Sequence, residues 1–484
     1  MPFVFPTINV DIIMPELILV VVAAGVLLLD TFAMHERSRT LAWLSLSGIA
    51  LAFTYALDLW GGPAVYGFSN MVVSDNFAVF LKFVILIAAG LTILFSASYL
   101  EKEELEHGEY YGLLLFAAVG MMLLAAATNF VTIFLGLETL SIALYVLAGF
   151  ARGNAKSDES ALKYFLLGAF ATGFLVYGMA LIFGATGTLD LSALSGIVIH
   201  VGIMQNPMLY AGVGLLLVGL AFKIALVPFH VWTPDVYEGA PTTVTAFMSV
   251  GTKAAALVAL SRVFLSGLSG IAPQWIGLLW ALAVLSMFAG NVVAIAQTNL
   301  KRMLGYSSIA HAGYLVIGVV AASNLGISSI AFYLLAYTFM NLGAFGVILY
   351  LERRGENLTL NDYAGLSSRF PLAAALMALF MFGLAGIPPT AGFVAKFYIF
   401  SAAIQAGYVG LAIIGVLTSV IGAYFYLRVI VYMYMRPAEG EMTPPVRSYG
   451  TATALVIAAV MTILLGTIPT PTLDMVRQIV LPGT

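Results

Sequence analysis

The sequence predicts an all-α polytopic membrane protein of about 14 transmembrane helices, folded as a single membrane domain over residues 1–484. Of its 484 residues, 62% are hydrophobic and only 9% are charged, and the mean hydropathy is +1.03. A soluble chain carries about 25% charged residues, so most side chains here must face lipid or other apolar helices. Long apolar stretches recur from end to end, which excludes a soluble domain with a single anchor.

Each apolar stretch is close to the ~20 residues that a helix needs to cross ~30 Å of hydrocarbon. The segment 189–200 is too short to span, and either an amphipathic helix along the outer interface or a plain polar loop would suit it. The start of the chain lacks the basic region of a signal peptide, so we expect the first span to be retained. The predicted spans cover residues 14–34, 40–60, 77–99, 111–128, 129–150, 162–187, 208–232, 241–265, 273–296, 303–322, 327–350, 371–404, 406–435 and 449–468.

The Lys and Arg residues of the loops are confined to alternate loops. The odd-numbered loops hold 12 of them, and the even-numbered loops hold none unless Arg262, at the end of the eighth span, is counted. By the positive-inside rule the odd loops are cytoplasmic and both termini lie on the outer side. The twelve residues are Arg37, Arg39, Lys102, Arg152, Lys156, Lys301, Arg302, Arg353, Arg354, Arg369, Arg436 and Arg447.

Prolines interrupt two of the predicted spans. The seventh contains Pro228, and the twelfth contains Pro388 and Pro389. Because proline removes a backbone donor and clashes with the preceding turn, we expect both helices to break there. Freed carbonyls are tolerated at membrane depth only where protein or water satisfies them. Breaks five spans apart are what an internal repeat of five helices would give, although two ordinary proline kinks are the simpler alternative.

Seven basic residues lie inside the predicted spans, and their depths differ. Arg262 and Arg428 lie near span ends, where a long side chain reaches the interface. Lys82 lies about two turns into its span and suits either a structural or a functional role. Lys163 follows Glu159 at the spacing of an ordinary helix-surface pair, so a relay role and a surface pair both remain open. The seven are Lys82, Lys163, Lys223, Lys253, Arg262, Lys396 and Arg428.

Four charged groups lie too deep to reach an interface: Glu138, Lys223, Lys253 and Lys396. An ionisable group at mid-membrane costs about 2.5–3.5 kcal/mol, so the four together cost on the order of 10 kcal/mol, comparable to the net stability of a domain. Such a cost indicates function, and lysines whose pKa depends on burial and on a nearby carboxylate can load and release protons. The alternative for Glu138 and Lys223 is a pair that only stabilises the fold.

Two histidines lie at a similar depth to these charges. His230 follows the first proline break, and His311 lies within the tenth predicted span. Histidine titrates near neutral pH, so either residue could relay protons between the lysines. A core histidine with satisfied hydrogen bonds is an equally good interpretation of His311.

Several function classes are excluded by what the sequence lacks. It contains no cysteine, which removes disulfides, iron–sulfur clusters and thiolate zinc sites. It has no Walker A motif, no dinucleotide-binding motif and no extramembrane domain large enough for one. No cofactor or metal is therefore expected in this chain, and nothing indicates a nucleic-acid partner. The driving energy must come from an ion gradient or a partner subunit.

Five stretches around the buried charges carry a family resemblance: Phe134–Ser141, Glu159–Phe165, Phe222–Pro241, Lys301–Tyr314 and Gly386–Phe397. In these stretches the sequence resembles the antiporter-like proton-channel subunits of respiratory complex I and of Mrp-type sodium/proton antiporters. Within that group it is most similar to the N-type subunits of bacterial NADH:quinone oxidoreductase. The resemblance covers roughly residues 110–435, and the run Trp-Thr-Pro-Asp-Val-Tyr-Glu-Gly at 232–239 is highly specific to the N type.

The resemblance implies an inverted repeat of spans 4–8 (residues 110–265) and 9–13 (residues 273–435), with three helices before it (1–100) and one after it (436–484). It implies that Glu138 and Lys223 form an ion pair in the first half, that Lys253 links the halves and that Lys396 opens the exit side. Lys163, His230 and His311 would be relay or modulating groups.

The resemblance also implies partners. The chain would be a non-redox subunit of a translocase in the bacterial inner membrane, bound to other membrane-arm subunits in a hetero-oligomer. FMN, iron–sulfur clusters and quinone would sit on those partner subunits. Two rival hypotheses are a subunit of an Mrp-type cation/proton antiporter and a scaffold that transmits motion without moving protons.

Overall fold

The all-α membrane fold is confirmed by the structure, a computed structural model that describes residues 8–32, 38–201, 206–352, 358–438 and 448–481. Within these ranges, 13 helices are long and apolar enough to cross a membrane. Two shorter apolar helices, Pro371–Ala385 and Ala391–Gln405, follow each other where the sequence predicts the twelfth span. Four of the basic loop residues, Arg37, Arg353, Arg354 and Arg447, lie outside the described ranges.

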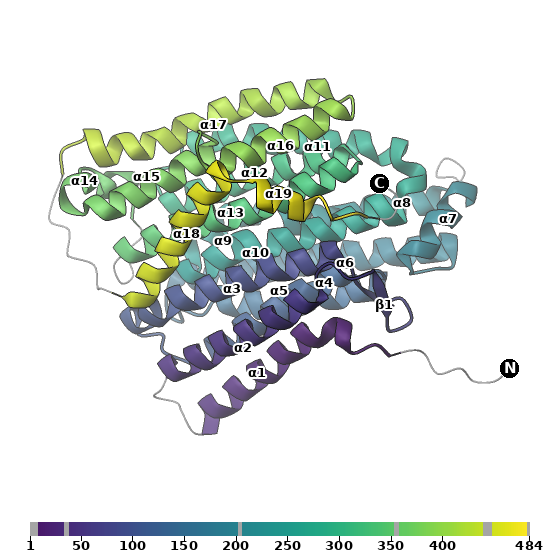
Figure 1. The fold of residues 1–484 in the computed structure, drawn as a ribbon, viewed down its shortest axis with the longest axis horizontal. Coiled ribbons are helices and arrows are strands. Elements are labelled where there is room, and N and C mark those ends of the chain that lie inside the picture. Colours follow the sequence, from purple (N-terminus) through teal and green to yellow (C-terminus); the bar gives the residue numbers. More distant parts are fainter. Residues whose placement is uncertain (1–7, 33–37, 202–205, 353–357, 439–447, 482–484) are drawn as a thin grey trace.

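The helices follow the predicted spans closely, and short helices and one small hairpin of two antiparallel strands fill the connections (Figure 1). The main helices of the bundle are α1 (Met14–Phe32), α2 (Ser38–Leu59), α3 (Asn76–Glu103), α4 (Glu109–Ala126), α5 (Phe130–Ala148), α6 (Ala155–Thr186), α8 (Pro207–Ile224), α10 (Thr242–Ser261), α11 (Ala272–Ile295), α12 (Leu300–Val320), α13 (Asn324–Leu351), α15 (Pro371–Ala385), α16 (Ala391–Gln405), α17 (Val409–Met435) and α18 (Tyr449–Thr467). The shorter elements are η1 (Asp11–Ile13), β1 (Val65–Gly67), β2 (Val72–Ser74), α7 (Leu191–Val201), α9 (Trp232–Gly239), η3 (Arg262–Gly267), η4 (Ser269–Ile271), η5 (Leu360–Tyr363), α14 (Leu366–Arg369) and α19 (Thr470–Val476).

Polar residues cap many of the helix starts. A helix leaves its first backbone N–H groups without partners, and such groups are costly near a bilayer. A side-chain oxygen of the preceding residue accepts a hydrogen bond from the first turn in seven helices, which removes part of this cost. The capping residues are Asp75, Asn129, Asn154, Asn206, Asn299, Ser323 and Ser448.

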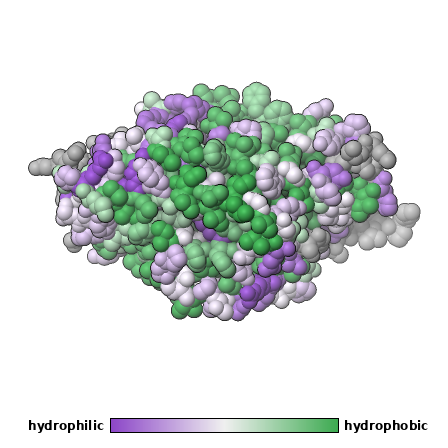
Figure 2. Space-filling model, turned by 90° about the horizontal axis from the view of Figure 1, so that it is seen from above, coloured by the Kyte–Doolittle hydropathy of each residue, from purple (hydrophilic) through white to green (hydrophobic). Residues whose placement is uncertain are grey.

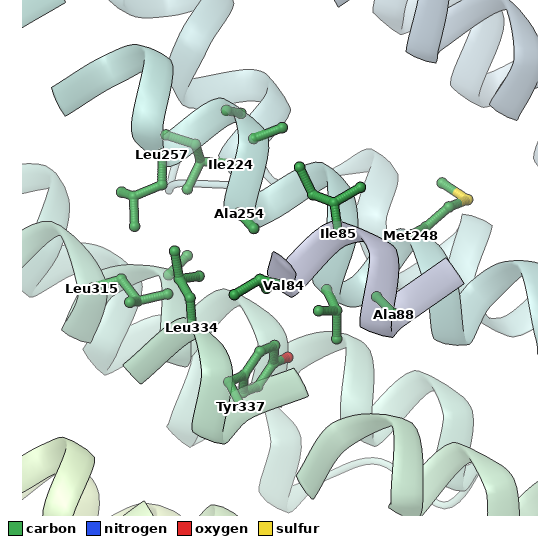
Figure 3. Close-up of a cluster of buried hydrophobic side chains, with 14 of the residues drawn as sticks. Val84, Ile85, Ala88, Ile224, Met248, Ala254, Leu257, Leu315, Leu334 and Tyr337 are labelled. Carbon is green, nitrogen blue, oxygen red and sulfur yellow. The ribbon is translucent and has the colours of Figure 1, made fainter. Parts of the chain in front are cut away.

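Four helices form the centre of the bundle. α10 is buried along its whole length, and α3, α12 and α13 are nearly so. Where they meet, Val84 of α3, Ala254 of α10, Leu315 of α12 and Leu334 of α13 belong to one apolar cluster (Figure 3). α3, the third of the N-terminal helices, is therefore part of the core.

The edges of the bundle are formed by the two ends of the chain. α1 and α2 lie along one edge and α15 to α17 along the other, while α18 crosses the bundle and packs on α13, α16 and α3 (Figure 1). Seen from above, hydrophobic residues dominate the middle of the surface and hydrophilic ones gather toward its margins (Figure 2). This distribution suits a protein whose sides face lipid.

Both proline-containing helices are broken, as predicted. α8 ends at Ile224, the chain runs without helix through Pro228, and α9 begins at Trp232. α15 ends at Ala385, and α16 begins after the two prolines at Ala391. The seventh span therefore ends eight residues earlier than the predicted 208–232, because the helix cannot continue through the segment before proline.

Side chains satisfy the carbonyls that the breaks release. The Lys396 ammonium donates to Leu384 O at 3.0 Å and to Ala385 O at 2.9 Å. At the other break, the Trp232 indole N–H donates to Phe222 O at 3.0 Å. Protein groups thus replace water at these carbonyls, which is the condition for an interrupted helix at membrane depth.

The segment 189–200 forms a helix rather than a polar loop. α7 (Leu191–Val201) buries Leu191, Leu194 and Val198 and packs against η3. These three positions lie on one face at helical spacing, so the amphipathic alternative is the correct one.

Two helix pairs cross with matching geometry at positions separated by 170 residues. A Cβ on Gly120 of α4 would overlap the backbone nitrogen of Leu140 on α5, and a Cβ on Gly290 of α11 would lie 2.5 Å from Ala310 N on α12. Only glycine allows such a close approach of two backbones. The same spacing relates residues 129 and 299, which form isolated strand-like bridges with residues 190 and 359.

Candidate functional site: buried lysines on hydroxyl partners

Lys253 lies on α10 at the centre of the bundle and is buried. Its ammonium donates to the Ser308 carbonyl at 2.5 Å and to the Ser308 hydroxyl at 2.7 Å, both on α12. α10 belongs to the first predicted half and α12 to the second. Lys253 therefore joins α10 directly to α12.

Lys223 lies in the last turn of α8, next to the first helix break. Its ammonium donates to the Ser141 hydroxyl at 2.7 Å and to the Tyr164 hydroxyl at 3.0 Å. The ammonium also lies over the rings of Tyr164, at 4.9 Å, and Tyr145, at 5.7 Å, where the ring quadrupoles attract a cation. The helix break thus presents a lysine to α5 and α6.

Glu138 does not form the expected direct ion pair with Lys223. Within the described part of the chain, no Glu138 oxygen lies within 4.0 Å of the Lys223 ammonium, and Glu138 Oε1 instead accepts from the Thr172 hydroxyl at 2.7 Å. The lysine is satisfied by the hydroxyls of Ser141 and Tyr164, so the carboxylate is not needed as its partner. In place of the implied direct pair, each group has its own hydroxyl partners: Thr172 for Glu138, and Ser141 and Tyr164 for Lys223.

A small cavity lies beside Lys223 and Thr172. Its volume is about 10 Å3, and its lining includes Lys223, Ser141, Tyr145 and Thr172. This is roughly the space for one water molecule. Thr172 also donates to Glu138, and Ser141 accepts from Lys223. The cavity therefore lies beside a hydroxyl partner of the carboxylate and a hydroxyl partner of the ammonium.

Lys396 lies on α16, just after the second helix break. Besides the two released carbonyls, its ammonium donates to the Ser419 hydroxyl of α17 at 2.8 Å. An ammonium has three donors, so all three are used. The group also lies 5.2 Å from the centre of the Tyr314 ring of α12.

His311 lies on α12, one turn from Ser308, and both ring nitrogens have tyrosine partners. Nδ1 lies 2.6 Å from the Tyr333 hydroxyl and Nε2 lies 3.1 Å from the Tyr426 hydroxyl. The Tyr426 hydroxyl also contacts the Ser307 hydroxyl. The imidazole is thus a satisfied core histidine, and the same contacts form a continuous set of proton-bearing groups beside Lys253.

Lys163 lies apart from the buried lysines. Its ammonium pairs with Asp235 and Glu159, each at 2.6 Å, and its side chain is about two-fifths exposed. α6 begins at Ala155, seven residues before the predicted span. The surface pair left open by the sequence therefore exists, together with a second carboxylate that sequence spacing could not reveal.

Arg302 and Lys156 extend this cluster at the same end of the bundle. Arg302 pairs with Asp235 at 2.7 Å and with Glu238 at 3.1 Å, and Lys156 pairs with Glu238 at 2.9 Å. Burial raises the pKa of Asp235, but hydrogen bonds from Lys163 and Arg302 outweigh it and hold that pKa below its ordinary value. Burial likewise raises the pKa of Glu238, but Lys156 and Arg302 outweigh burial and hold that pKa below its ordinary value.

His230 lies in the non-helical stretch between α8 and α9 and is half-buried. The stretch is fixed by the bond from Val227 N to the Ser286 hydroxyl, at 2.9 Å. The structure places His230 between the Lys223 turn and α9, and its Nδ1 has no side-chain partner among the described residues, the lysines included.

The three remaining basic residues of the spans each have carboxylate or backbone carbonyl partners. Lys82 pairs with Glu16 of α1 at 2.8 Å, and both side chains are buried. Arg262 pairs with Asp75 at 2.6 Å and also donates to Ala125 O, so it is buried rather than extended to the interface. Arg428 donates to Ile295 O and Gln297 O, each at 2.6 Å, at the end of α11.

A second buried cluster was missed at the level of sequence, which placed Lys301 in a loop. Lys301 lies in the first turn of α12 and is buried, with Glu352 at 3.8 Å. The Thr242 hydroxyl joins the two, at 3.1 Å from Lys301 Nζ and 2.5 Å from Glu352 Oε2. Only contacts between α10, α12 and α13 reveal this cluster, and no local sequence signal marks it.

Buried lysines at two helix breaks and at the junction of two helix groups define an antiporter-like membrane protein. The family model described as NADH:quinone oxidoreductase/Mrp antiporter, transmembrane region, matches residues 127–422. The chain is 54% identical to NADH-quinone oxidoreductase subunit N of Trichlorobacter lovleyi over 482 residues, which covers 98% of each chain. It therefore belongs to the NADH-quinone oxidoreductase subunit N family.

Solved structures give the same fold. A chain of respiratory complex I from Thermus thermophilus superposes with a TM-score of 0.81 at 36% identity, covering 95% of this chain and 99% of that one. A chain of the Mrp complex from Dietzia sp. superposes with a TM-score of 0.85 at 21% identity, covering 96% of each. The second likeness shows the fold alone.

Proposed function

We propose that this chain is the proton-translocating, non-redox membrane subunit of an NADH:quinone oxidoreductase, and that Glu138, Lys223, Lys253 and Lys396 carry the protons. The observation that carries the proposal is the environment of the three lysines. Each is buried, and each donates to hydroxyls or carbonyls with no carboxylate in direct contact among the described residues. A lysine held in this way is not fixed in its charged form by an ion pair, so it can give up and regain a proton.

The order of the groups supports a route along the bundle. Thr172, Ser141 and the small cavity connect Glu138 to Lys223. Beyond the first half, Lys253 reaches Ser308, and His311 follows one turn further along α12. We place Lys396 at the end of the route, and we assign Lys163 and His230 modulating roles beside it.

The matching contacts separated by 170 residues support an internal repeat. We propose that α4–α10 and α11–α17 are the two copies, with boundaries near 110–265 and 273–435. The crossings at Gly120 and Gly290 and the bridges of Asn129 and Asn299 then occupy equivalent places. The inversion of one copy relative to the other is part of the proposal, and so are the three preceding helices and the C-terminal helix as separate segments.

The partners follow from the family. Relatives named NADH-quinone oxidoreductase subunit N, together with the complex I match, support a hetero-oligomer with other membrane-arm subunits in a bacterial inner membrane. We assign FMN, iron–sulfur clusters and quinone to those partners and no cofactor to this chain. The charge of the loops supports a topology with both termini on the outer side.

An Mrp-type antiporter is the second candidate. Its support is the fold shared with the Dietzia Mrp complex, at 21% identity. The 54% identity to a subunit N protein over nearly the full chain favours the oxidoreductase. Co-purification with flavin- and cluster-bearing subunits separates the two, because an antiporter complex would lack them and would depend on sodium.

The experiment is Lys223→Met in the assembled complex, with proton pumping and NADH-driven electron transfer measured in sealed membranes. Both activities should fall together by tenfold or more while assembly stays intact, since the methionine packs like lysine but carries no proton. The double variant Lys82→Met/Glu16→Gln is the matched control, because it removes a buried pair outside the route. Wild-type pumping in an assembled Lys223→Met complex would instead support the scaffold hypothesis.

A further inference from the structure

A groove opens between α13, α15 and α18, away from the buried lysines. Its volume is about 730 Å3, within the range of about 300–1,000 Å3 that is typical of small-molecule sites. Its walls are almost wholly apolar, with Leu372 and Leu376 on α15 facing Leu455, Val456 and Val460 on α18. α18, which supplies one wall, crosses this part of the bundle (Figure 1).

The polar lining residues gather at one end of the groove. Tyr350 lies in the last turn of α13, Arg369 ends α14 just before α15, and Ser448 and Tyr449 begin α18. Arg369 belongs to the basic set of loops that the sequence assigns to one side of the membrane. One end of the groove therefore carries a cation and two tyrosines, and the rest is hydrocarbon-like.

The length of the groove is close to the thickness of one leaflet of a bilayer. Its lining on α18 runs from Ser448 to Val460, which is about 18 Å at ~1.5 Å per residue. Half of the ~30 Å hydrocarbon core is about 15 Å. A transmembrane helix of a partner would need a face about twice as long, so the dimensions fit a lipid better than a helix.

We propose that this groove binds one anionic phospholipid, with an acyl chain along α18 and the phosphate beside Arg369. A guanidinium matches the geometry of phosphate oxygens, and tyrosines favour the headgroup region. The surface is accessible in this chain, because Tyr449 is 96% exposed and Leu372 is 73% exposed. The lipid would fill the space between α18 and the second half of the bundle and so hold α18 in place.

The test uses the assembled complex in nanodiscs that contain a trace of phosphatidylglycerol with a photoreactive acyl chain. Cross-linked peptides are mapped by mass spectrometry, and photoreactive phosphatidylcholine serves as the zwitterionic comparison. We expect cross-links on α15 and α18 with phosphatidylglycerol in roughly fivefold excess, the preference that one arginine near a headgroup provides.

Two variants with matched controls locate the site. Ala452→Phe fills the groove and should remove the cross-links, whereas Thr453→Phe places the same ring at the next exposed position of α18, outside the lining, and should not. Arg369→Gln should abolish the preference for phosphatidylglycerol, whereas Arg436→Gln removes a charge from another basic loop residue and should leave it intact.

Three results would overturn the proposal. Equal labelling by both lipids in the wild type would mean ordinary contact with bulk lipid. Labelling that persists in Ala452→Phe would place the lipid elsewhere. If the residues that line the groove take no lipid and instead cross-link to a partner subunit, the groove is a protein docking surface.

Discussion

Among individual residues, the buried lysines share one kind of environment. Lys223, Lys253 and Lys396 each donate to a serine hydroxyl at 2.7–2.8 Å. By contrast, Lys82 is paired directly with a carboxylate. A neutral hydroxyl accepts a hydrogen bond from ammonium and can also donate one to a neutral amine, so it tolerates both protonation states. A carboxylate favours the charged state alone.

This difference predicts the effect of Ser308. Ser308→Ala should lower proton pumping several-fold, because a hydrogen bond to a charged group contributes about 1.5–3 kcal/mol and the Ser308 carbonyl still holds Lys253. Ser308→Thr keeps the hydroxyl and should retain most activity. Pumping and assembly are measured together, and an equal loss in both variants would show that only packing at this position matters.

The lowered pKa values of Asp235 and Glu238 predict a second outcome. A carboxylate with a depressed folded-state pKa contributes stability that is present above its unfolded pKa, near 4, and is lost as the pH falls through the folded value. Arg302→Gln should therefore lower the melting temperature of the complex by the same few degrees at pH 6, 7 and 8. If the decrease in melting temperature differs between pH 6 and pH 8, other groups of the cluster titrate in this range.

Among the helices, a break and its lysine form one unit. Lys396 satisfies the last carbonyls of α15 while it lies on α16, so the break positions the functional group and the functional group stabilises the break. Gly386 connects the two, with a φ of +85° that side chains rarely adopt. α17 also contacts this break, because its Ser419 hydroxyl accepts a hydrogen bond from Lys396.

Gly386→Ala should disturb this unit. The new Cβ would lie 2.8 Å from Lys396 Cδ, in addition to a left-handed backbone cost of about 1–2 kcal/mol. Gly407→Ala is a matched control, since Gly407 has a φ of +86° but no atom within 4 Å of the added Cβ. Gly386→Ala should lower pumping well below the level of Gly407→Ala, as measured in assembled complexes. Equal activities would show that the lysine position tolerates the displacement.

Across the entire bundle, buried ion pairs join the N-terminal helices to the core. Lys82 and Glu16 connect α3 to α1, and Arg262 and Asp75 connect the end of α10 to the start of α3. α3 also packs on α10, α13 and α18. The N-terminal segment is thus anchored to the two predicted halves by packing and by charge.

The Lys82–Glu16 pair predicts a double-mutant result. Lys82→Met alone leaves a buried carboxylate without its partner and should destabilise the chain by about 3–5 kcal/mol. Adding Glu16→Gln removes that charge and should restore much of the loss. The yield and thermal stability of the complex report both effects. A double variant as unstable as the single one would mean that the lysine contributes through packing.

The membrane class, the approximate positions of the spans, both helix breaks and the buried lysines could all be predicted from the sequence. These features are local: a helix of about 20 apolar residues crosses the bilayer, proline interrupts a helix, and a charge at mid-membrane is costly wherever it occurs. The residues of the five motif stretches also pointed to the family.

The contacts of each charged group could not be predicted and emerge from the packing of the helices. Lys253 meets Ser308, Lys301 meets Glu352 and Arg262 meets Asp75, and each pair joins helices that are distant in the sequence. The separate hydroxyl partners of Glu138 and Lys223, in place of the expected direct pair, have the same origin. Side-chain partners across helices depend on how the helices pack, and periodicity along one helix carries no information about the rotation or depth of its neighbour.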